Sequence, residues 1–309
     1  MADKPKILIS PRSLTRDGHP ALQRLEAAGF ELVYAPKGRQ PTEAELLELL
    51  PGCVGFLAGV EPVPARVLDA AAATLTVISR NGTGISNIDL DAARRLGIQV
   101  RPTPGANARG VAELAMALIL ALVRGVAAAD RQLKDEQWTR TKGIELDGRV
   151  LGVVGCGNIG RRVAQMALAM GMRVEGCDPC RDDTFAPDGF AYAELDTVLA
   201  ESDIVSLHCP PPADGTPLIG CETLGRMKRG AYLVNTARGE LLDEAAVLEA
   251  LESGQLAGVA MDAFREEPPG NNALVKHERV IATPHIGGYT VESVDRAVGA
   301  AVDNLLEVL

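Results

Sequence analysis

The chain has 309 residues, the length of about two domains of ordinary size. Its formal net charge of −10 at pH 7 argues against a nucleic-acid-binding protein, which would need a basic face. Hydrophobic residues make up 47% of the chain and aromatic residues only 3%, so we expect cores packed mainly by aliphatic side chains.

The first residues and the apolar stretches predict a cytoplasmic protein that does not enter a membrane. Lys4-Pro5-Lys6 leads directly into a short strand-like run at 7–9, which is unlike a signal peptide. The longest apolar stretch, 114–123, is too short to span a bilayer. Six cysteines without a secretory signal are expected to be reduced thiols.

The first third of the chain alternates short β-like runs with helical runs, which is typical of a parallel sheet with crossover helices. Thr42 and Glu45 form a candidate capping box, and Gly29 and Gly97 stand where helix C-caps usually occur. We predict strands at 7–10, 31–35, 53–58, 76–79 and 99–101, and helices at 21–28, 42–50, 65–71 and 90–96.

A polar, glycine-rich loop, Arg80-Asn81-Gly82-Thr83-Gly84, follows the fourth of these strands. It lies at the carboxyl end of a strand, where open α/β sheets bind ligands. Arg80 is therefore either a clamp for a substrate anion or a solvated loop residue, and the residues alone leave both open.

The segment 102–105, Pro-Thr-Pro-Gly, interrupts regular structure and predicts a crossing between two domains. Residues 111–129 are then nearly all apolar or Ala-rich, which predicts one helix buried around most of its circumference. We interpret this helix as a dimer element, with burial inside its own domain as the alternative.

A G-x-G-x-x-G turn at 155–160 stands between an apolar β-like run and an amphipathic helical stretch. In this arrangement Gly155 makes the turn, Gly157 lets the backbone approach a pyrophosphate, and Gly160 lets helix and strand pack closely. The helix N-terminus presents free N–H groups to the anion. The next apolar run, 172–177, ends at Asp178, which can bind the ribose hydroxyls and repel a 2′-phosphate, so NAD is favoured over NADP.

Four more β-like runs, at 204–207, 231–235, 256–261 and 280–282, follow along the chain. Each ends at a polar residue on the edge where a cofactor would bind; these are His208, Thr236, Asp262 and Thr283. The last stretch, 291–309, is one amphipathic helix. It is long enough to cross back onto the first domain and make that domain discontinuous.

Arg238, Glu267 and His285 are the residue types that hydride transfer between a nicotinamide and a keto acid needs. Imidazole is a suitable proton donor near neutral pH, and a neighbouring carboxylate favours its protonated form. A guanidinium can hold a substrate carboxylate with two hydrogen bonds. From spacing alone the set is only suggestive.

Cys177-Asp178-Pro179-Cys180 has C-x-x-C spacing, but it surrounds the predicted ribose-binding acid at a strand end. No second C-x-x-C completes a zinc site, so we predict no metal site and no redox pair. Cys156 lies inside the glycine turn, where we expect thiol reagents to attack it and NADH to slow the reaction.

Several motifs resemble those of the NAD-dependent D-isomer-specific 2-hydroxyacid dehydrogenase family, most closely its phosphoglycerate dehydrogenase branch. The resemblance covers essentially the whole chain. It rests on the glycine turn with Asp178, on Asn235-Thr-Ala-Arg-Gly239, on Asp262-Ala-Phe-Arg-Glu-Glu-Pro268 and on Thr283-Pro-His-Ile-Gly-Gly288, with upstream support from Asn81-Gly-Thr-Gly84, Asn87-Ile-Asp89, Thr103-Pro and Asn107-x-x-x-Val-Ala-Glu113.

The resemblance implies Arg238 as the substrate-binding arginine, His285 as proton donor and acceptor, and Glu267 as its acidic partner. It implies that Asn158 and Ile159 contact the pyrophosphate. The positions that match cofactor-binding ones are Thr83, Gly155, Gly157, Asn158, Ile159, Gly160, Asp178, His208, Cys209, Pro210, Thr236, Ala237, Arg238, Asp262 (at the nicotinamide carboxamide), His285 and Gly287. The positions that match substrate-binding ones are Arg80, Asn81, Gly82, Asn107, Arg238 and His285.

The family's architecture implies an α/β protein with two Rossmann-like domains. A flavodoxin-like substrate domain at 1–101 and 289–309 would be interrupted by an NAD-binding Rossmann domain at 102–288. Homodimers would form through the NAD-binding domains. Because the sequence stops at Leu309, we expect a short form without the regulatory C-terminal domain of many phosphoglycerate dehydrogenases.

The leading hypothesis is therefore reversible, NAD-dependent interconversion of a D-2-hydroxy acid and the small anionic 2-oxo acid, with 3-phosphoglycerate and 3-phosphohydroxypyruvate as first candidates. Glyoxylate, hydroxypyruvate or sulfopyruvate are alternative substrates, with Arg80, Arg140 and Lys142 as candidate extra cations. A formate dehydrogenase usually carries Gln where Glu267 stands, and weaker similarity disfavours a phosphite dehydrogenase. A non-catalytic NAD-sensing protein is the alternative from another class.

Overall fold

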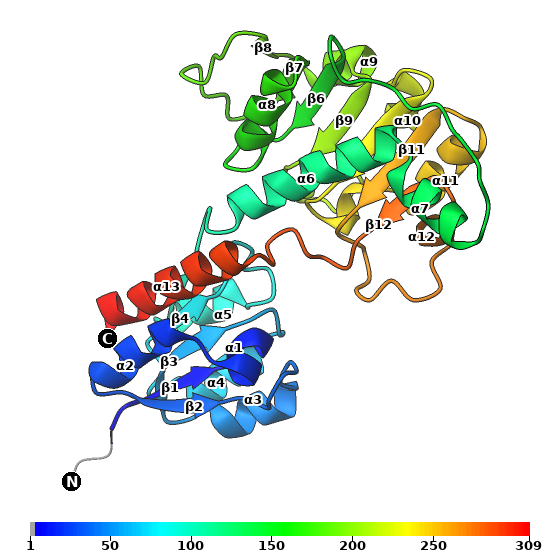
Figure 1. The fold of residues 1–309 in the computed structure, drawn as a ribbon. Coiled ribbons are helices and arrows are strands. Elements are labelled where there is room, and N and C mark those ends of the chain that lie inside the picture. The colour runs from blue at the N-terminus through cyan, green and yellow to red at the C-terminus, as the bar shows by residue number, and fades with distance from the viewer. Residues whose placement is uncertain (1–3) are drawn as a thin grey trace. The chain divides into compact units, whose positions relative to one another are not determined.

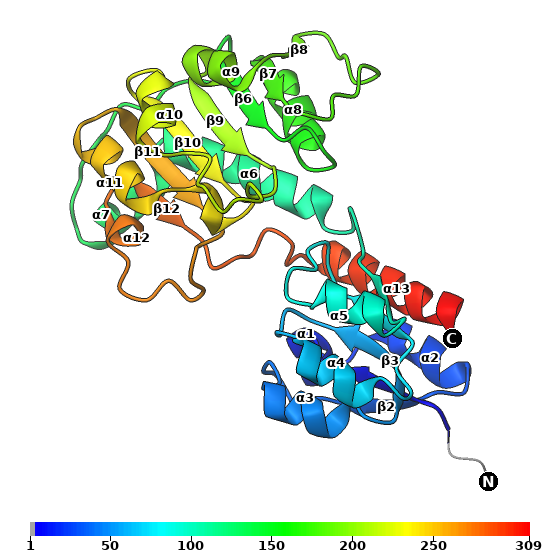
Figure 2. The same cartoon turned by 180° about the vertical axis from the view of Figure 1, so that it is seen from behind.

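The structure is a computed structural model that describes residues 4–309. It divides into two compact units (Figures 1 and 2). The first unit contains the described residues up to Asn107 together with Val291–Leu309, and the second is Ala108–Thr290. Each unit is built on its own parallel sheet.

The first unit has a five-stranded parallel sheet in the order β2-β1-β3-β4-β5. This order is that of flavodoxin-like folds, in which the strand order reverses beside the first strand. The strands are β1 (Lys6–Ile9), β2 (Glu31–Tyr34), β3 (Cys53–Ala58), β4 (Val77–Arg80) and β5 (Gln99–Arg101).

Helices cover both faces of this sheet, because successive side chains of a strand point to opposite faces. Ile7 and Ile9 pack under the C-terminal helix α13 (Val291–Val308), whereas Leu8 packs in a second cluster with residues of α3, α4 and α5. The other helices are α1 (Arg12–Asp17), the 3-10 helix η1 (Pro20–Leu22), α2 (Gln23–Ala27), α3 (Glu43–Leu49), α4 (Ala65–Ala71) and α5 (Leu90–Arg95).

The second unit has a seven-stranded parallel sheet in the order β12-β11-β10-β9-β6-β7-β8. Its first six strands in chain order follow the Rossmann arrangement, with the reversal between β6 and β9. The strands are β6 (Val150–Val154), β7 (Arg173–Cys177), β8 (Phe190–Tyr192), β9 (Ile204–Leu207), β10 (Ala231–Asn235), β11 (Leu256–Met261) and β12 (Val280–Ala282).

The faces of this second sheet carry two hydrophobic clusters. Buried side chains of α6 and α8 pack on one face, and side chains of α9, α10, α11 and α12 pack on the other. The helices are α6 (Ala108–Val123), α7 (Val126–Lys134), α8 (Gly160–Ala169), α9 (Leu195–Glu201), α10 (Cys221–Arg226), the 3-10 helix η2 (Gly239–Leu241), α11 (Glu244–Glu252) and α12 (Ala273–Lys276).

The prediction of one helix over 111–129 is wrong, because Gly125 separates α6 from α7. Gly125 has φ +63°, a left-handed conformation that ends the first helix. α6 is largely buried, whereas no residue of α7 is buried. Within residues 4–309 no single helix is long and apolar enough to cross a membrane; α6 and α7 pass that test only as a pair, bent by 62°.

The fold class and most predicted elements are confirmed. The Thr42 and Glu45 capping box is present, and the strands expected at 53–58, 204–207, 231–235, 256–261 and 280–282 have the expected bounds. The helix expected at 21–28 is instead a 3-10 turn followed by the short helix α2.

The crossings between the units lie at Asn107/Ala108 and Thr290/Val291, whereas the sequence-based boundaries stand at 101/102 and 288/289. The segment after β5 belongs to the first unit, because its polar groups form hydrogen bonds with other residues of that unit. The Gly82 N–H donates to Thr103 Oγ1 (2.8 Å), and Arg296 Nε donates to the carbonyl of Ala106 (2.9 Å).

Candidate active site

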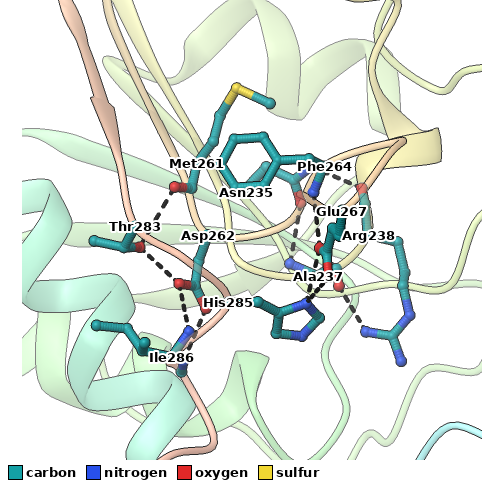
Figure 3. Close-up of polar contacts among 11 residues, drawn as sticks. Asn235, Ala237, Arg238, Met261, Asp262, Phe264, Glu267, Thr283, His285 and Ile286 are labelled. Atoms are coloured by element: carbon teal, nitrogen blue, oxygen red, sulfur yellow. Dashed lines mark hydrogen bonds and ion pairs between the residues drawn. The ribbon is translucent and has the colours of Figure 1, made fainter. Parts of the chain in front are cut away.

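The three predicted catalytic residues follow the carboxyl ends of three strands in the second unit (Figure 3). Arg238 follows β10, Glu267 follows β11, and His285 follows β12. These strands are neighbours in the parallel sheet, so their carboxyl ends lie at one edge.

His285 and Glu267 form a close pair. His285 Nδ1 lies 2.8 Å from Glu267 Oε1 and 2.9 Å from Oε2, and the two side chains are 49% and 40% exposed. The main-chain N–H of Phe264 also donates to Glu267 Oε1 (3.1 Å). With Nδ1–H donating to the carboxylate, the imidazole presents Nε2 to a reactant.

The buried carboxylate of Asp262 holds the turn that carries His285. Its Oδ1 accepts hydrogen bonds from the Thr283 hydroxyl (2.6 Å) and the Ile286 N–H (2.8 Å), and its Oδ2 accepts from the Gly287 N–H (2.8 Å). His285 itself has φ +52°, in the left-handed region. The turn is thus tied down on both sides of the imidazole.

Arg238 is exposed, whereas Thr236 and Gly239 in the same turn are buried. Its Nη1 donates to the carbonyl of Ala237 (2.7 Å), and its own carbonyl accepts a hydrogen bond from Asn235 Nδ2 (2.7 Å). The guanidinium therefore offers its remaining N–H donors to an anion in front of the sheet edge.

The glycine turn fits a dinucleotide on geometric grounds. A Cβ on Gly155 (φ +95°) would lie 2.6 Å from the Cys209 nitrogen, and a Cβ on Gly160 would lie 1.9 Å from the Gly155 carbonyl oxygen. Gly157, in contrast, faces open space, where a Cβ would fill the room of a phosphate. α8 begins at Gly160, so its first N–H groups point at that space.

Asp178, at the end of β7, is fixed by the turn itself. The N–H of Cys156 donates to its Oδ2 and that of Cys180 to its Oδ1, both at 2.7 Å. These two bonds leave lone pairs on the carboxylate for the hydroxyls of a ribose. A negative group held there disfavours a 2′-phosphate.

Two buried polar atoms next to this edge have no partner within the described chain, His208 Nδ1 and Thr236 Oγ1. His208 Nε2 is occupied by the Ser206 hydroxyl (2.9 Å). Burial lowers the pKa of His208 to about 4, so the ring is neutral at pH 7. Unsatisfied buried groups are costly, which supports a ligand with polar groups of its own at this position.

The expectation that Cys156 reacts readily with thiol reagents is wrong. Its side chain is buried, and burial, with Asp178 nearby, raises the pKa of the thiol to about 12. Burial likewise raises the pKa of Cys209 to about 11 and raises that of Cys177. Because the thiolate is the nucleophile, the exposed Cys180 and Cys221 are better targets.

Five of the predicted residues, Arg80, Asn81, Gly82, Thr83 and Asn107, lie in the first unit. Arg80 ends β4, Asn81 donates its N–H to the carbonyl of Ala58 (2.9 Å), and Gly82 has φ +140°. Thr83 and Asn107 lie in the loops after β4 and β5. Within residues 4–309, no group of three or more His, Cys, Asp or Glu side chains is arranged to hold a metal ion.

The sequence alone assigns no role to Asn235, and it marks Thr283 only as a strand-end residue. Both side chains make hydrogen bonds inside the candidate site. Both residues stand in motifs that resemble those of the family, at 235–239 and 283–288. Their hydrogen-bond partners, however, become evident only in the folded turns.

Comparison with known proteins identifies the family. Residues 116–287 match the model of the D-isomer specific 2-hydroxyacid dehydrogenase, NAD binding domain. D-3-phosphoglycerate dehydrogenase of Sus scrofa is 41% identical over 276 residues, which are 88% of this chain and 51% of that protein. Hydroxypyruvate reductase of Thermotoga maritima is 41% identical over 261 residues, 82% of this chain and 84% of that protein.

A solved structure gives the same result. D-lactate dehydrogenase from Aquifex aeolicus, in complex with NAD and lactic acid, has a TM-score of 0.83 at 29% identity, covering 97% of this chain and 94% of that one. The chain belongs to the D-isomer specific 2-hydroxyacid dehydrogenase family, and the predicted cofactor, NAD, is confirmed. The chain spans about half the length of the D-3-phosphoglycerate dehydrogenases that it matches.

Replacing Asp178 with Asn should shift cofactor preference. The variant keeps an acceptor for a backbone N–H but loses the charge. Weakening hydrogen bonds to a charged group costs about 1.5–3 kcal/mol, so the Kd of NADH should rise at least about tenfold. The affinity for NADPH should fall much less. Fluorescence titration with both cofactors measures the ratio of their Kd values. An unchanged ratio of the two Kd values would refute the role of Asp178.

His208 should make the free protein acid-sensitive. Its pKa is depressed in the folded state, to about 4, so the unfolded chain binds the proton more readily. The free energy of unfolding is highest above about pH 6.5. It falls by about 2–3 kcal/mol as the pH drops toward 4, because the unfolded chain takes up the His208 proton first. Urea unfolding at several pH values should show a weaker acid loss in His208→Gln. Identical pH profiles for the two proteins would contradict this explanation.

Proposed function

We propose that this chain is an NAD-dependent enzyme that interconverts a D-2-hydroxy acid and the corresponding 2-oxo acid. The observation that carries the proposal is the His285 and Glu267 pair beside the exposed cation of Arg238. A proton donor and an anion-binding group at one sheet edge are what reduction of a keto acid requires.

In the direction of reduction, Arg238 binds the carboxylate of the 2-oxo acid and polarises the neighbouring carbonyl. His285 Nε2 then gives its proton to the carbonyl oxygen, which becomes the hydroxyl group. Glu267 keeps the ring oriented through Nδ1 and stabilises its protonated form. When bound, the cofactor would supply the hydride as NADH in reduction and accept it as NAD⁺ in oxidation.

In the direction of oxidation the same groups act in reverse. Neutral His285 takes the hydroxyl proton at Nε2, and Glu267 stabilises the imidazolium that forms. Arg238 holds the carboxylate in both directions. The reaction therefore consumes one proton in reduction and releases one in oxidation.

We propose the following groups as cofactor-binding residues. Gly155, Gly157, Asn158, Ile159 and Gly160 would hold the pyrophosphate, Asp178 the ribose, and Asp262 the nicotinamide carboxamide, with Thr83, His208, Cys209, Pro210, Thr236, Ala237, Arg238, His285 and Gly287 as further contacts. The free lone pair of Asp262 Oδ2 and the unpartnered Thr236 Oγ1 and His208 Nδ1 support this set. Arg80, Asn81, Gly82 and Asn107 remain proposed substrate-binding residues, together with Arg238 and His285.

The first candidate substrate pair is 3-phosphoglycerate and 3-phosphohydroxypyruvate. It is supported by relatives named D-3-phosphoglycerate dehydrogenase. Hydroxypyruvate is the second candidate, because a relative matched over most of its own length is named hydroxypyruvate reductase.

We propose a cytoplasmic location for the protein. All six cysteines are free thiols, which supports a reducing compartment.

The test is NADH oxidation against 3-phosphohydroxypyruvate, hydroxypyruvate, glyoxylate, pyruvate and 3-sulfopyruvate, with Arg238→Ala in parallel. The wild type should turn over at least one of them. Losing a charged, desolvated contact should cost Arg238→Ala about 3 kcal/mol, or more than about 100-fold in kcat/KM. Arg238→Lys keeps the charge without the two-pronged geometry and should lose less.

Two results would contradict the proposal. Unchanged kcat/KM in Arg238→Ala would remove this residue from the mechanism. NADH binding without turnover of any oxo acid in the panel would favour an NAD-sensing protein.

We further propose that the chain forms a homodimer through α6 and α7. A groove along these helices is lined mostly by apolar side chains, namely Ala117, Leu120, Ala121, Arg124, Val126, Ala129, Asp130 and Leu133. Val126 and Leu133 are 53% and 58% exposed. Large exposed apolar side chains gathered in one groove favour burial against a second copy.

Leu133→Asp should weaken this dimer, because association would bury an unpaired charge. Light scattering after size exclusion should give a dimer for the wild type and a larger monomer fraction for the variant. Met170→Asp, which changes a 38% exposed side chain outside the groove, is the matched control. A monomeric wild type, or a variant as dimeric as the control, would overturn the interface.

A further inference from the structure

We propose that Asn235 is a positioning residue that fixes Arg238 relative to the proton-carrying His285. The inference rests on the proposed function. Asn235 is the last residue of β10 and is fully buried, so its amide touches no solvent and is not itself placed to bind a ligand. Its three polar groups instead connect the segments of the candidate site.

The amide of Asn235 closes the turn that presents Arg238. Its Oδ1 accepts the N–H of Ala237 (3.0 Å), and its Nδ2 donates to the carbonyl of Arg238 (2.7 Å). The turn is thus held by one acceptor and one donor from the same side chain. The exposed guanidinium extends from a backbone whose position the buried amide determines.

The carbonyl of Asn235 connects this turn with the His285 turn. It accepts the N–H of Asp262 (2.9 Å), the residue that follows β11. The carboxylate of Asp262 in turn binds the N–H groups of Ile286 and Gly287, directly after His285. One short chain of hydrogen bonds therefore runs from the Arg238 carbonyl to the imidazole turn.

Close backbone packing makes the connection rigid. A Cβ on Gly239 would lie 2.0 Å from the Phe264 carbonyl carbon and 2.1 Å from the Arg265 nitrogen, so the Arg238 turn rests directly on the loop after β11. That loop leads to Glu267, which the Phe264 N–H also binds. The turn has no room to shift toward this loop when its other restraints are present.

Only an amide satisfies both bonds of the Asn235 side chain. A carboxylate at this position keeps an acceptor for Ala237 but places a second acceptor against the Arg238 carbonyl. Ser is too short to reach both groups, and Ala removes both. We therefore expect the Arg238 turn to move in all three variants while Glu267 and His285 keep their direct contact.

The experiment compares Asn235→Asp, Asn235→Ser and Asn235→Ala with the wild type. Readouts are the KM and kcat for the 2-oxo acid that the wild type reduces, the Ki of oxalate as an unreactive dianion, the Kd of NADH, and the pH profile of kcat. Asn272→Ala is the matched control. Asn272 also accepts two N–H groups and donates to another residue, but its bonds cap α12 and reach Glu244 of α11, not the turns that carry Arg238 and His285.

Misplacing Arg238 should raise both the oxo-acid KM and the oxalate Ki, with a loss of about 10- to 100-fold in kcat/KM. The Kd of NADH should change far less, because the glycine turn and Asp178 are unchanged and the moved turn supplies only part of the proposed cofactor contacts. The pH profile should stay near that of the wild type, because the His285 and Glu267 pair is unchanged. The control variant should lose stability while its oxo-acid KM and oxalate Ki stay unchanged. A purely structural role would instead lower the amount of active enzyme and leave KM and Ki unchanged.

Three outcomes would overturn the inference. The first is an unchanged KM and Ki in folded variants. The second is a loss of kcat/KM that is matched by an equal rise in the Kd of NADH. The third is failure of all three variants to fold, which would make Asn235 a folding residue. Absence of turnover in the wild type would instead refute the proposed function, and the oxalate and NADH titrations would show that separately.

Discussion

The structure of the candidate site depends on one constraint, that all strands of a parallel sheet end at the same edge. In the second unit this constraint brings together residues that are far apart in the sequence, because β10, β11 and β12 are neighbours. Arg238 and His285 are separated along the chain by two strands, two α-helices and the 3-10 helix η2, yet each follows a strand of this set. The reversal beside β6 places the glycine turn and Asp178 along the same edge.

Buried polar groups then convert this general placement into a defined geometry. Asp262 and Asn235 are both buried at strand ends, and each uses its side chain to bind the backbone of a turn that carries an exposed functional residue. The exposed residues need that support, because a side chain at the surface is otherwise free to rotate. Fully satisfied buried networks are rigid, whereas partly satisfied ones are costly.

Much of this arrangement could be predicted from the sequence. A strand-like run, a glycine-rich turn and a helical run in succession predicted the nucleotide-binding turn with Asp178. Short motifs indicated Arg238, Glu267 and His285. The break at Gly125 was missed because a single glycine in an apolar helical run is often tolerated. The role of Asn235 was missed because it depends on where two carbonyls and two N–H groups lie in space. The reactivity expected of Cys156 was wrong because burial inside the turn is a tertiary property.

The most direct test of the account is the single-turnover rate of NADH oxidation by His285→Asn, measured by stopped flow with the 2-oxo acid that the wild type reduces. Proton donation by His285 is the step that the account assigns to this edge of the sheet. The rate should fall at least about 100-fold. The Kd of NADH should change far less, because the glycine turn and Asp178 are unchanged. A rate close to that of the wild type, with NADH bound as tightly, would contradict the account.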